Sequence, residues 1–361
     1  MKVLHVDTRP DWRGGQSQLL LLLEGLCARG HQAELAVMEG SPLAERARAA
    51  GILAHALPAG LWPLAGPRMI RRLVAASGFE IVHAHDPHGL TAAWLGRVHR
   101  AAALLAHRRI AAPLHGSPVA LARYRAARRL IAISRLVAEK LVGSGIQAAR
   151  VVVVYDGVRV PGVVSAEARR EARRVWGVAD DEILMGYVAH LVPGKNHEAL
   201  LRALPKMLKL RPGCRLIFAG DGPRRRELQE LSRALKIENR VIFAGFVGDV
   251  AQVYRALDVF LFPALEEGLG SSLLEAMAHG LPCVAAASGA VPEIIENGRD
   301  GILLPVRAAG EFEAGLVRTW AEWADFRDAE RLGKAARVRV EQHFSDSVMV
   351  ESTLRVYEGA L

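Results

Sequence analysis

The amino-acid sequence predicts an α/β protein of two doubly wound domains, each with a parallel sheet, which face one another across a cleft. The first observation is a regular alternation of short apolar runs with longer helical patterns, typical of strands joined by crossover helices. The second is the length of 361 residues, which suits two domains better than one core. The third is the composition, 51% hydrophobic and 24% charged, which excludes disordered, collagenous and coiled-coil chains.

The first series of strands occupies the N-terminal half. It opens with a strand at 2–7 and a leucine-rich helix at Gln16–Arg29, which ends at Gly30. Further apolar runs predict strands at 32–38, 80–86, 102–108, 129–134 and 150–158. Helical stretches separate these runs, so we expect a parallel sheet that is covered on both faces.

A second series of strands predicts a second sheet. The expected strands lie at 182–190, 214–220, 240–246, 259–264, 282–287 and 301–305. The polar stretch Pro161–Arg174 marks the junction, which gives an N-terminal domain at 1–165 and a C-terminal domain at 166–344. We expect the last segment, 345–361, to form a helix that joins the N-terminal domain. Because ligands of such sheets bind beyond the carboxyl ends of the strands, two facing sheets predict one shared site.

The composition also indicates a compartment. No apolar stretch approaches the roughly 18–20 residues that span a bilayer, and the N-terminus has no apolar core or cleavage site of a secretory signal. The three cysteines, Cys27, Cys214 and Cys283, are scattered, as expected for buried thiols in a reducing cytosol. We therefore expect a cytoplasmic protein.

Positive charge is concentrated in the first half of the chain. Residues 1–165 hold 21 Lys and Arg against 10 Asp and Glu, a net charge of +11, whereas the remainder carries −2. Nine arginines but no acidic residue occur between Asp86 and Glu139. This asymmetry indicates an anionic partner, such as an anionic membrane surface on whose inner face the protein would be peripheral. A solvated basic face is the alternative. Nucleic acid is not expected, because no helix-turn-helix, zinc or aromatic-interleaved basic motif occurs.

The segment 263–295 carries the strongest chemical pattern. An apolar strand ends at Pro263, and a glycine-bearing loop leads to Ser271, where a helix is expected to begin. Free amides at a helix N-terminus attract phosphate. Glu267 precedes that helix and Glu275 lies about one turn inside it, so two carboxylates could bracket a ligand with vicinal hydroxyls. The alternative is a loop charge and a solvated helix residue.

The two glutamates, with seven residues between them, resemble the paired-glutamate motif of family-4 retaining glycosyltransferases of the GT-B fold, which has two Rossmann-like domains. The resemblance covers nearly the whole chain. The strings that carry it are RGGQSQ, HAHD, AISRLVAEKLVGSGI, VVVVYDGV, HLVPGKNHEALLRA, AGDGPRRREL, EEGLGSSLLEAMAHGLPCVA and SGAVPEII. It implies transfer of a sugar from a nucleotide-diphosphate sugar to a hydroxyl acceptor, with retention, without a metal and without a cofactor.

The resemblance also implies a donor site in the second half. Glu275 would hold the ribose, while Glu267 would orient the sugar and diphosphate together with the amides of Gly268, Gly270 and Ser271. Lys195 matches the lysine that neutralises the diphosphate. His190 stands where the family usually has an arginine, which puts a second cationic clamp in doubt. The remaining matches are Gly220 and Gly222 near the nucleotide, and Phe246 and Val247 beside the base.

In the first half, Gly14 and Gly15 resemble the family loop that contacts the donor phosphates and the acceptor. His85 or His107 would lie near the transferred sugar, so the expected catalytic residues are Glu267, Lys195, His85 and His107. The histidines at 83, 85 and 88 cluster at a strand end, but no carboxylate or cysteine spacing supports a metal site, and isolated histidines are more often structural. Asp156–Gly157 replaces an Asn-Gly pair, a change expected to affect little beyond a turn.

The segment HRRIAAPLHG at 107–116 resembles one found in enzymes that act on lipopolysaccharide or other cell-envelope acceptors. It implies a lipid-linked or glycan acceptor; a basic surface loop is the alternative. Two other functions stay open. One is a nucleotide-sugar epimerase or hydrolase of the same fold. The other is a non-catalytic polyanion-binding protein with a decayed transferase site, which the histidine at 190 favours.

Overall fold

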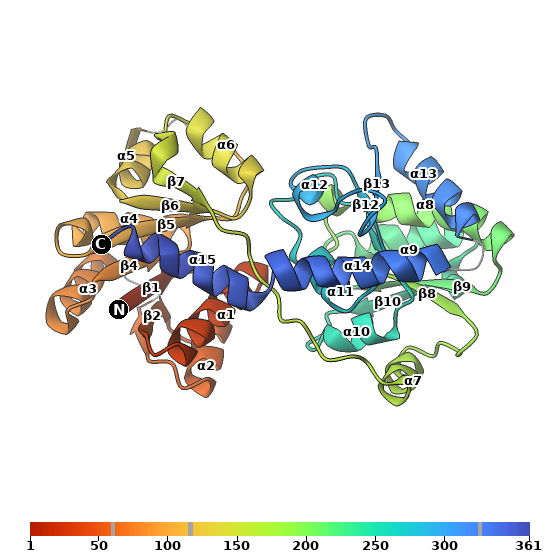
Figure 1. Ribbon diagram of the computed structural model, residues 1–361, viewed down its shortest axis with the longest axis horizontal. Coiled ribbons are helices and arrows are strands. Elements are labelled where there is room, and N and C mark those ends of the chain that lie inside the picture. The colour runs from red at the N-terminus through yellow and green to blue at the C-terminus, as the bar shows by residue number, and fades with distance from the viewer. Residues whose placement is uncertain (59–61, 115–117, 324–326) are drawn as a thin grey trace. The chain divides into compact units, whose positions relative to one another are not determined.

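The computed structural model describes residues 1–58, 62–114, 118–323 and 327–361. The chain forms two compact units: unit 1 is Met1–Gly157 with Asp346–Leu361, and unit 2 is Val158–Ser345. Each unit contains a parallel sheet and its covering helices (Figure 1). This confirms the predicted fold class of two doubly wound α/β domains. The boundaries predicted at 165/166 and 344/345 compare with unit boundaries at 157/158 and 345/346.

Unit 1 holds a seven-stranded sheet in the order β3-β2-β1-β4-β5-β6-β7. Its strands are β1 Lys2–Asp7, β2 Gln32–Met38, β3 Ala54–Leu57, β4 Ile81–Ala84, β5 Ala103–Arg108, β6 Arg129–Ala132 and β7 Val151–Val153. From the centre of the sheet, the strand numbers rise from β1 to β3 toward one edge and from β4 to β7 toward the other. Since parallel crossovers are right-handed, helices after β1 and β2 cover one face and helices after β4 to β6 cover the other. The switch point therefore lies between β1 and β4.

Several helices of unit 1 begin at residues whose side chains cap the helix. They are α1 Gly14–Ala28, α2 Pro42–Ala49, α3 Trp62–Ser77, α4 Pro87–Leu95, α5 Pro118–Ala126, α6 Arg135–Gly143 and α15 Asp346–Glu358. Asp86 caps α4 by accepting hydrogen bonds from the backbone N–H groups of His88 and Gly89, with Pro87 in the first turn. Ser134 caps α6 by accepting from Val137.

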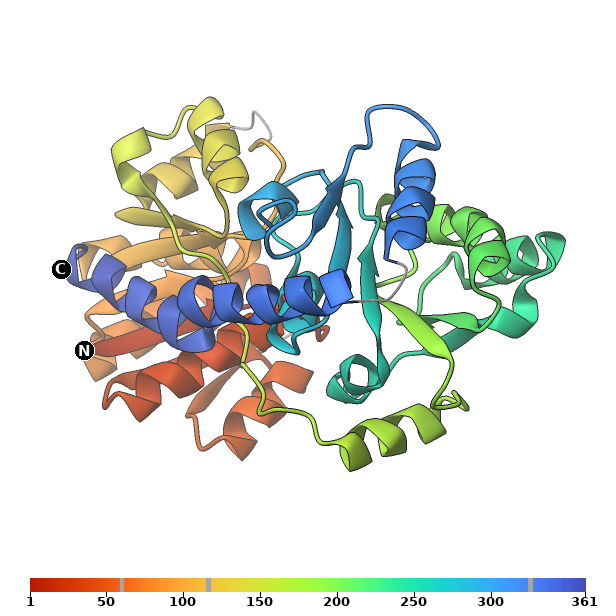
Figure 2. The same cartoon turned by 45° about the vertical axis from the view of Figure 1, so that its right-hand side comes forward.

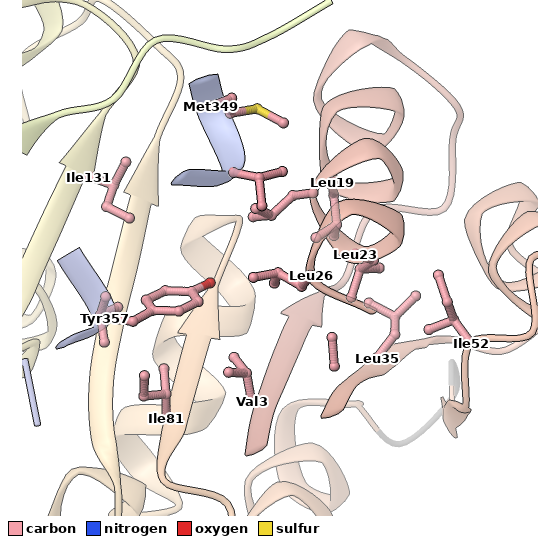
Figure 3. Packing of buried hydrophobic residues seen from close by; sticks show 14 of the residues in the cluster. Val3, Leu19, Leu23, Leu26, Leu35, Ile52, Ile81, Ile131, Met349 and Tyr357 are labelled. Carbon is pink, nitrogen blue, oxygen red and sulfur yellow. The ribbon is translucent and has the colours of Figure 1, made fainter. Parts of the chain in front are cut away.

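The C-terminal helix α15 completes the core of unit 1. It lies alongside α1 in both views (Figures 1 and 2). Its residues Met349 and Tyr357 join a buried apolar cluster with Leu26 of α1, Val3 of β1 and Ile131 of β6 (Figure 3). Full burial of one such side chain contributes about 1.5–3 kcal/mol. Segments far apart in the sequence thus share one core.

Unit 2 holds a six-stranded sheet in the order β10-β9-β8-β11-β12-β13, with its switch point between β8 and β11. Its strands are β8 Ile183–Val188, β9 Cys214–Ala219, β10 Val241–Gly245, β11 Val259–Phe262, β12 Cys283–Ala286 and β13 Ile302–Leu304. Its helices are α7 Ala166–Val175, α8 His197–Leu210, α9 Arg225–Ala234, α10 Ala251–Ala256, α11 Ser271–Ala278, α12 Val291–Ile294, α13 Glu311–Glu322 and α14 Arg327–His343. Within the described part of the chain, no helix is long and apolar enough to cross a membrane.

Two elements differ from the sequence-based expectation. Strand β3 was not predicted, because its four residues Ala-His-Ala-Leu form an edge strand that is only partly buried and carries no apolar run. Helix α7 occupies most of the stretch interpreted as a polar junction. Ser165 caps that helix by accepting from the N–H of Ala168 at 3.1 Å, and Arg173 turns inward to Asp258 at 3.0 Å. Most of the stretch is therefore part of a helix, in which Arg173 is buried and most of the other charged residues are exposed.

Candidate functional site

The site in unit 2 is built where β11 ends, next to the switch point of its sheet. The buried strand β11 leads into a loop that ends at Gly270, whose φ of +113° is a conformation that favours glycine. Gly270 is the N-cap of α11, and its carbonyl accepts the N–H groups of Leu273 and Leu274, both at 3.1 Å. The N–H groups of a helix's first turn have no carbonyl partner within the helix. They give the start of α11 the partial positive charge that binds anions.

Glu275 lies one turn into α11 and is held by a tyrosine. The hydroxyl of Tyr254, on α10, donates to Oε2 of Glu275 at 2.8 Å. Burial raises the pKa of Glu275, and the hydrogen bond from Tyr254 opposes that rise. Burial and the adjacent glutamate raise the pKa of Tyr254 well above its usual value, so the phenol stays a donor. The hydrogen bond from Tyr254 therefore holds the carboxyl group of Glu275 in orientation.

Glu267 forms an ion pair with Lys195. Lys195 ends the short 3-10 turn Pro193–Lys195, which the loop after β11 holds in place: Leu265 N–H donates to the carbonyl of Gly194 at 3.0 Å. Both charged side chains keep partial access to solvent, 26% for the lysine and 18% for the glutamate. Pairs with such access contribute little to stability, about 0–1 kcal/mol. The lysine is thus placed beside Glu267 by the two loops and can exchange that partner for an anion.

The predicted glycines of the β9 loop have a demonstrable structural role. A Cβ at Gly220 would lie 2.1 Å from the carbonyl oxygen of Ala189, and one at Gly222 would lie 2.6 Å from that of Leu191. The loops after β8 and β9 therefore touch backbone to backbone, and only glycine fits. This approach holds the exposed His190 between Ala189 and Leu191. Contact with a nucleotide stays a prediction for these glycines.

Arg224 could replace the arginine that the family has at position 190, but its guanidinium already has partners. Arg224 follows the β9 loop, and its N–H donates to the carbonyl of Leu191 at 3.2 Å. Its guanidinium is already bound by Glu198, at 2.8 Å, and by Glu227. These carboxylates raise its pKa further. The predicted base-contacting pair lies at the end of β10, where Phe246 is 74% exposed and Val247 is half-buried.

The switch point of unit 1 gathers four buried histidines. His5 of β1 pairs in register with His83 of β4, and His85 and His107 follow at the ends of β4 and β5. Nδ1 of His5 lies 2.9 Å from Nε2 of His85, and Nδ1 of His83 lies 2.8 Å from the hydroxyl of Tyr357. Burial lowers the pKa of each of the four, that of His5 to about 3. All four rings are neutral at physiological pH.

Among the described residues, three of these rings form a group that could hold a metal ion. The candidate ligand atoms of His5, His83 and His85 lie within 4.8 Å of one another, and three histidines are a known zinc ligand set. In this structure, however, Nδ1 of His5 pairs with Nε2 of His85 and Nδ1 of His83 pairs with Tyr357. Nε2 of His5 and Nε2 of His83 have no hydrogen-bond partner among the described residues. Arg109 also approaches, its Nη1 lying 3.5 Å from Nδ1 of His85. A metal would have to displace these contacts beside a fixed positive charge.

Arg109 connects the histidines with the predicted glycine loop. A Cβ at Gly15 would lie 3.5 Å from Cδ of Arg109, so the guanidinium stem packs against the start of α1, which Gly14 opens. Nε of Arg109 lies 3.5 Å from Oδ1 of Asp156, and Nε2 of His107 lies 4.0 Å from the same oxygen. Asp156 is buried, 6% exposed. The expectation that the change to Asp156 affects little beyond a turn is therefore wrong, because its carboxylate faces Arg109 and His107.

Sequence reasoning missed Arg109 and Asp156 as site residues, and also Tyr254 and Asp7. Asp7 ends β1 and is 2% exposed. Its pKa is raised to about 6 by burial and by Asp86, against the opposing effects of the Arg9 N–H, Gln16 and Arg109. The signal in the sequence was position, because Asp7 ends β1 and Asp86 lies two residues after β4, and these two strands flank the switch point. Tyr254 and Asp156 have no such signal, since only tertiary packing brings them to their partners.

Family models match both halves of the chain. Residues 12–160 match the model of Glycosyltransferase Family 4, and residues 168–339 match that of Glycosyl transferases group 1. A glycosyltransferase of Methanocaldococcus jannaschii, named MJ1607 and uncharacterized, is 33% identical over 217 residues, which are 59% of this chain and 55% of that protein. A D-inositol 3-phosphate glycosyltransferase of Kribbella flavida is 34% identical over 247 residues, 65% of this chain and 57% of that one. The chain thus spans about half the length of the curated relatives that it matches.

Solved structures share the fold over the whole chain. HepE of Anabaena, crystallised with UDP, superposes with a TM-score of 0.85 at 23% identity and covers 99% of this chain and all of its own. The lipopolysaccharide outer core galactosyltransferase WaaB gives a TM-score of 0.75 at 20% identity, with full coverage of both chains. Two family models that together match most of the chain, and the GT-B architecture of these neighbours, lead to one conclusion: the chain belongs to the glycosyltransferases of the GT-B fold.

Proposed function

We propose that the protein transfers a sugar from a nucleotide-diphosphate sugar to a hydroxyl acceptor. The observation that carries this proposal is the arrangement in unit 2, where Lys195 and Glu267 pair beside the start of α11 and Glu275 is oriented one turn further on. A diphosphate at this helix start would meet backbone N–H groups and a lysine, and a ribose would meet a fixed carboxylate. The UDP and UDP-glucose bound in structures of HepE support a donor of this class.

Leaving-group stabilisation is the main chemical task. A departing diphosphate gains negative charge as the glycosidic bond breaks, and preorganised donors aimed at that charge lower the barrier. Lys195 would supply a full positive charge and the α11 amides partial ones, without a metal. Each group acts more strongly on the transition state than on the bound substrate, so its effect falls on kcat.

The stereochemical course that we propose is retention. The carboxylate of Glu267 is occupied by Lys195 and lies beside the helix start, a position suited to orienting a sugar. The acceptor hydroxyl would attack from the face that the diphosphate leaves, with a diphosphate oxygen taking its proton. His85 and His107, neutral and buried in unit 1, are the catalytic candidates that would contact the sugar.

The acceptor that we propose is a lipid-linked or cell-envelope glycan, reached from an anionic membrane surface on the cytoplasmic side. WaaB, a structural neighbour, is named for lipopolysaccharide outer core transfer. In unit 1, the guanidinium groups of Arg125 and Arg129 donate to the neutral backbone carbonyls of Gly145 and Ala149, which do not neutralise their positive charge. Arg128 donates to an oxygen of Leu361, the last residue. The apolar side chains of Leu95, Ile110 and Val119 are more than half exposed in the same stretch. Basic groups near an anionic leaflet contribute about 1 kcal/mol each.

Nucleoside diphosphate release from a panel of nucleotide sugars, measured with and without a glycan acceptor, tests the function. A transferase releases diphosphate in step with glycosylated acceptor, and NMR of the product shows an unchanged anomeric configuration. Release at the same rate without acceptor would indicate a hydrolase or epimerase instead. Absence of release with every donor, despite nucleotide binding, would indicate a non-catalytic protein.

A further inference from the structure

The carboxylate of Asp156 lies in a buried cluster with His107 and Arg109. The cluster joins two ends of the unit 1 sheet: His107 and Arg109 lie at the end of β5, and Asp156 lies three residues after β7. Oδ1 of Asp156 lies 3.5 Å from Nε of Arg109 and 4.0 Å from Nε2 of His107. The side chains of His107 and Asp156 are 4% and 8% exposed.

Four polar atoms of this cluster have no hydrogen-bond partner among the described residues. They are both ring nitrogens of His107, Nε of Arg109 and Oδ1 of Asp156. Buried polar groups are normally paired, so a cluster of unpaired ones indicates a place where a ligand or water completes the hydrogen bonds. His85 differs in this respect, because its two nitrogens face His5 and Arg109. His107 is thus the histidine of the two candidates whose ring is free to accept a ligand group.

The neighbours of His107 select which nitrogen carries the proton. A neutral imidazole has one N–H and one lone pair, and the group next to one nitrogen decides the tautomer. An ionised carboxylate accepts hydrogen bonds and donates none. Asp156 approaches Nε2, so it favours the proton on that nitrogen and leaves the lone pair on Nδ1. Burial raises the pKa of Asp156, and the positive charge of Arg109 opposes that rise and favours the ionised carboxylate.

We propose that Asp156 is a positioning residue that, together with Arg109, fixes His107 as the Nε2–H tautomer, so that Nδ1 accepts a hydrogen bond from a hydroxyl of the bound sugar. The last part rests on the proposed function, whereas the tautomer does not. An asparagine at 156 would have the same shape, but its amide presents both a donor and an acceptor and therefore selects neither tautomer. The carboxylate of Asp156 is therefore the feature that specifies the tautomer of the His107 ring.

Ring ¹⁵N NMR of the whole protein tests the tautomer directly, with the His107 signals assigned by their loss in His107→Asn. At pH 7.5, the wild type is expected to show a protonated Nε2 and an unprotonated Nδ1, and Asp156→Asn is expected to show a mixture. Glu34→Gln is the matched control, because Glu34 holds His55 at 2.7 Å on the strands β2 and β3. It should change the His55 signals and leave those of His107 and the turnover unchanged. A wild-type His107 protonated on Nδ1, or an unaltered ring in Asp156→Asn, overturns the proposal.

Kinetics test the consequence for the reaction. Asp156→Asn is expected to lower kcat about tenfold, which corresponds to about 1.4 kcal/mol, with the KM for the donor unchanged. On a His107→Asn background the same change should cost little more, because the ring that Asp156 orients is gone. An equal loss on both backgrounds would show that Asp156 acts only through the fold and would overturn the positioning role. If no donor supports turnover in the wild type, the proposed function fails, but the NMR result still decides the tautomer.

Discussion

The hydroxyl of Tyr357 lies 2.8 Å from Nδ1 of His83, so the C-terminal helix α15 is hydrogen-bonded to the central strand β4. Both residues are fully buried, and Nε2 of His83 has no partner within the described residues. The tyrosine is therefore the hydrogen-bond partner of Nδ1 of His83. Through this contact the last helix of the chain supports the histidines at the switch point of unit 1.

Tyr357→Phe is expected to destabilise unit 1. It leaves Nδ1 of His83 buried without a partner, which costs about 1–3 kcal/mol. The free energy of unfolding is measured by urea titration, with hydrogen exchange of the β4 amides as the readout. Tyr187→Phe is the matched control, because the buried hydroxyl of Tyr187 has no partner among the described residues and its removal should cost little. Equal losses in both variants would contradict a specific role of the Tyr357 contact.

Much of the fold could be predicted from the sequence because the strands of a parallel sheet are short, buried apolar runs. The predicted strands 2–7 and 214–220 correspond to β1 and β9 almost residue for residue. Strand β3 was not predicted, because it is a short strand at the sheet edge whose residues Ala-His-Ala-Leu are only partly buried. The loop of Glu267 and the start of α11 could also be placed, since glycine and serine before an apolar helix are local signals. The contacts of Tyr254 with Glu275 and of Asp156 with His107 could not, because separate elements bring them together.

Stability should fall in mild acid because His197 is buried uncharged. In the unfolded chain a histidine binds a proton near pH 6.5, whereas in unit 2 the pKa of His197 is lowered to about 3 by burial and by nearby cations. The unfolded state binds more protons between these values, so the contribution to stability is complete above pH 6.5 and is lost as the pH falls. His197→Leu removes this titration.

Comparison of unfolding free energies at pH 7.5 and pH 5 checks this prediction. The drop in the wild type is expected to exceed that in His197→Leu by about 2 kcal/mol, from about 1.4 kcal/mol per pKa unit over the titrated range. His5 titrates in the same direction but is present in both proteins. Identical drops would show that His197 can take up its proton in the folded protein.

Turnover should not require a divalent cation. The sequence contains no Asp-x-Asp string of the kind that holds a metal on the diphosphate, and the proposed charge comes from Lys195 and the start of α11. Turnover before and after treatment with EDTA, with metal content measured in parallel, tests this. Full activity is expected after chelation. Complete loss of turnover that magnesium or manganese restores would refute the metal-free mechanism. If the protein instead contains one metal ion per chain, His5, His83 and His85 are the candidate ligands.

Binding to anionic vesicles should depend on the arginines of unit 1. Co-sedimentation is expected with vesicles that contain an anionic lipid and not with neutral ones. It should weaken with salt, because the Debye length falls from about 10 Å at 0.1 M to about 3 Å at 1 M. Arg125→Ser/Arg128→Ser should reduce binding. The charge-matched control is Arg170→Ser/Arg174→Ser, on the exposed face of α7 in unit 2. Equal effects of the two pairs would contradict a docking surface on unit 1.

The steady-state kinetics of Lys195→Ala test the central claim, that unit 2 stabilises a departing diphosphate, most directly. Loss of one preorganised charge at the leaving group is expected to lower kcat about 100-fold or more, with the protein folded and the acceptor KM nearly unchanged. Glu275→Ala should instead weaken binding of the nucleotide as well, because its carboxylate is assigned to the ribose. If Lys195→Ala has the kcat of the wild type at saturating donor, the assignment of the diphosphate to this site is contradicted.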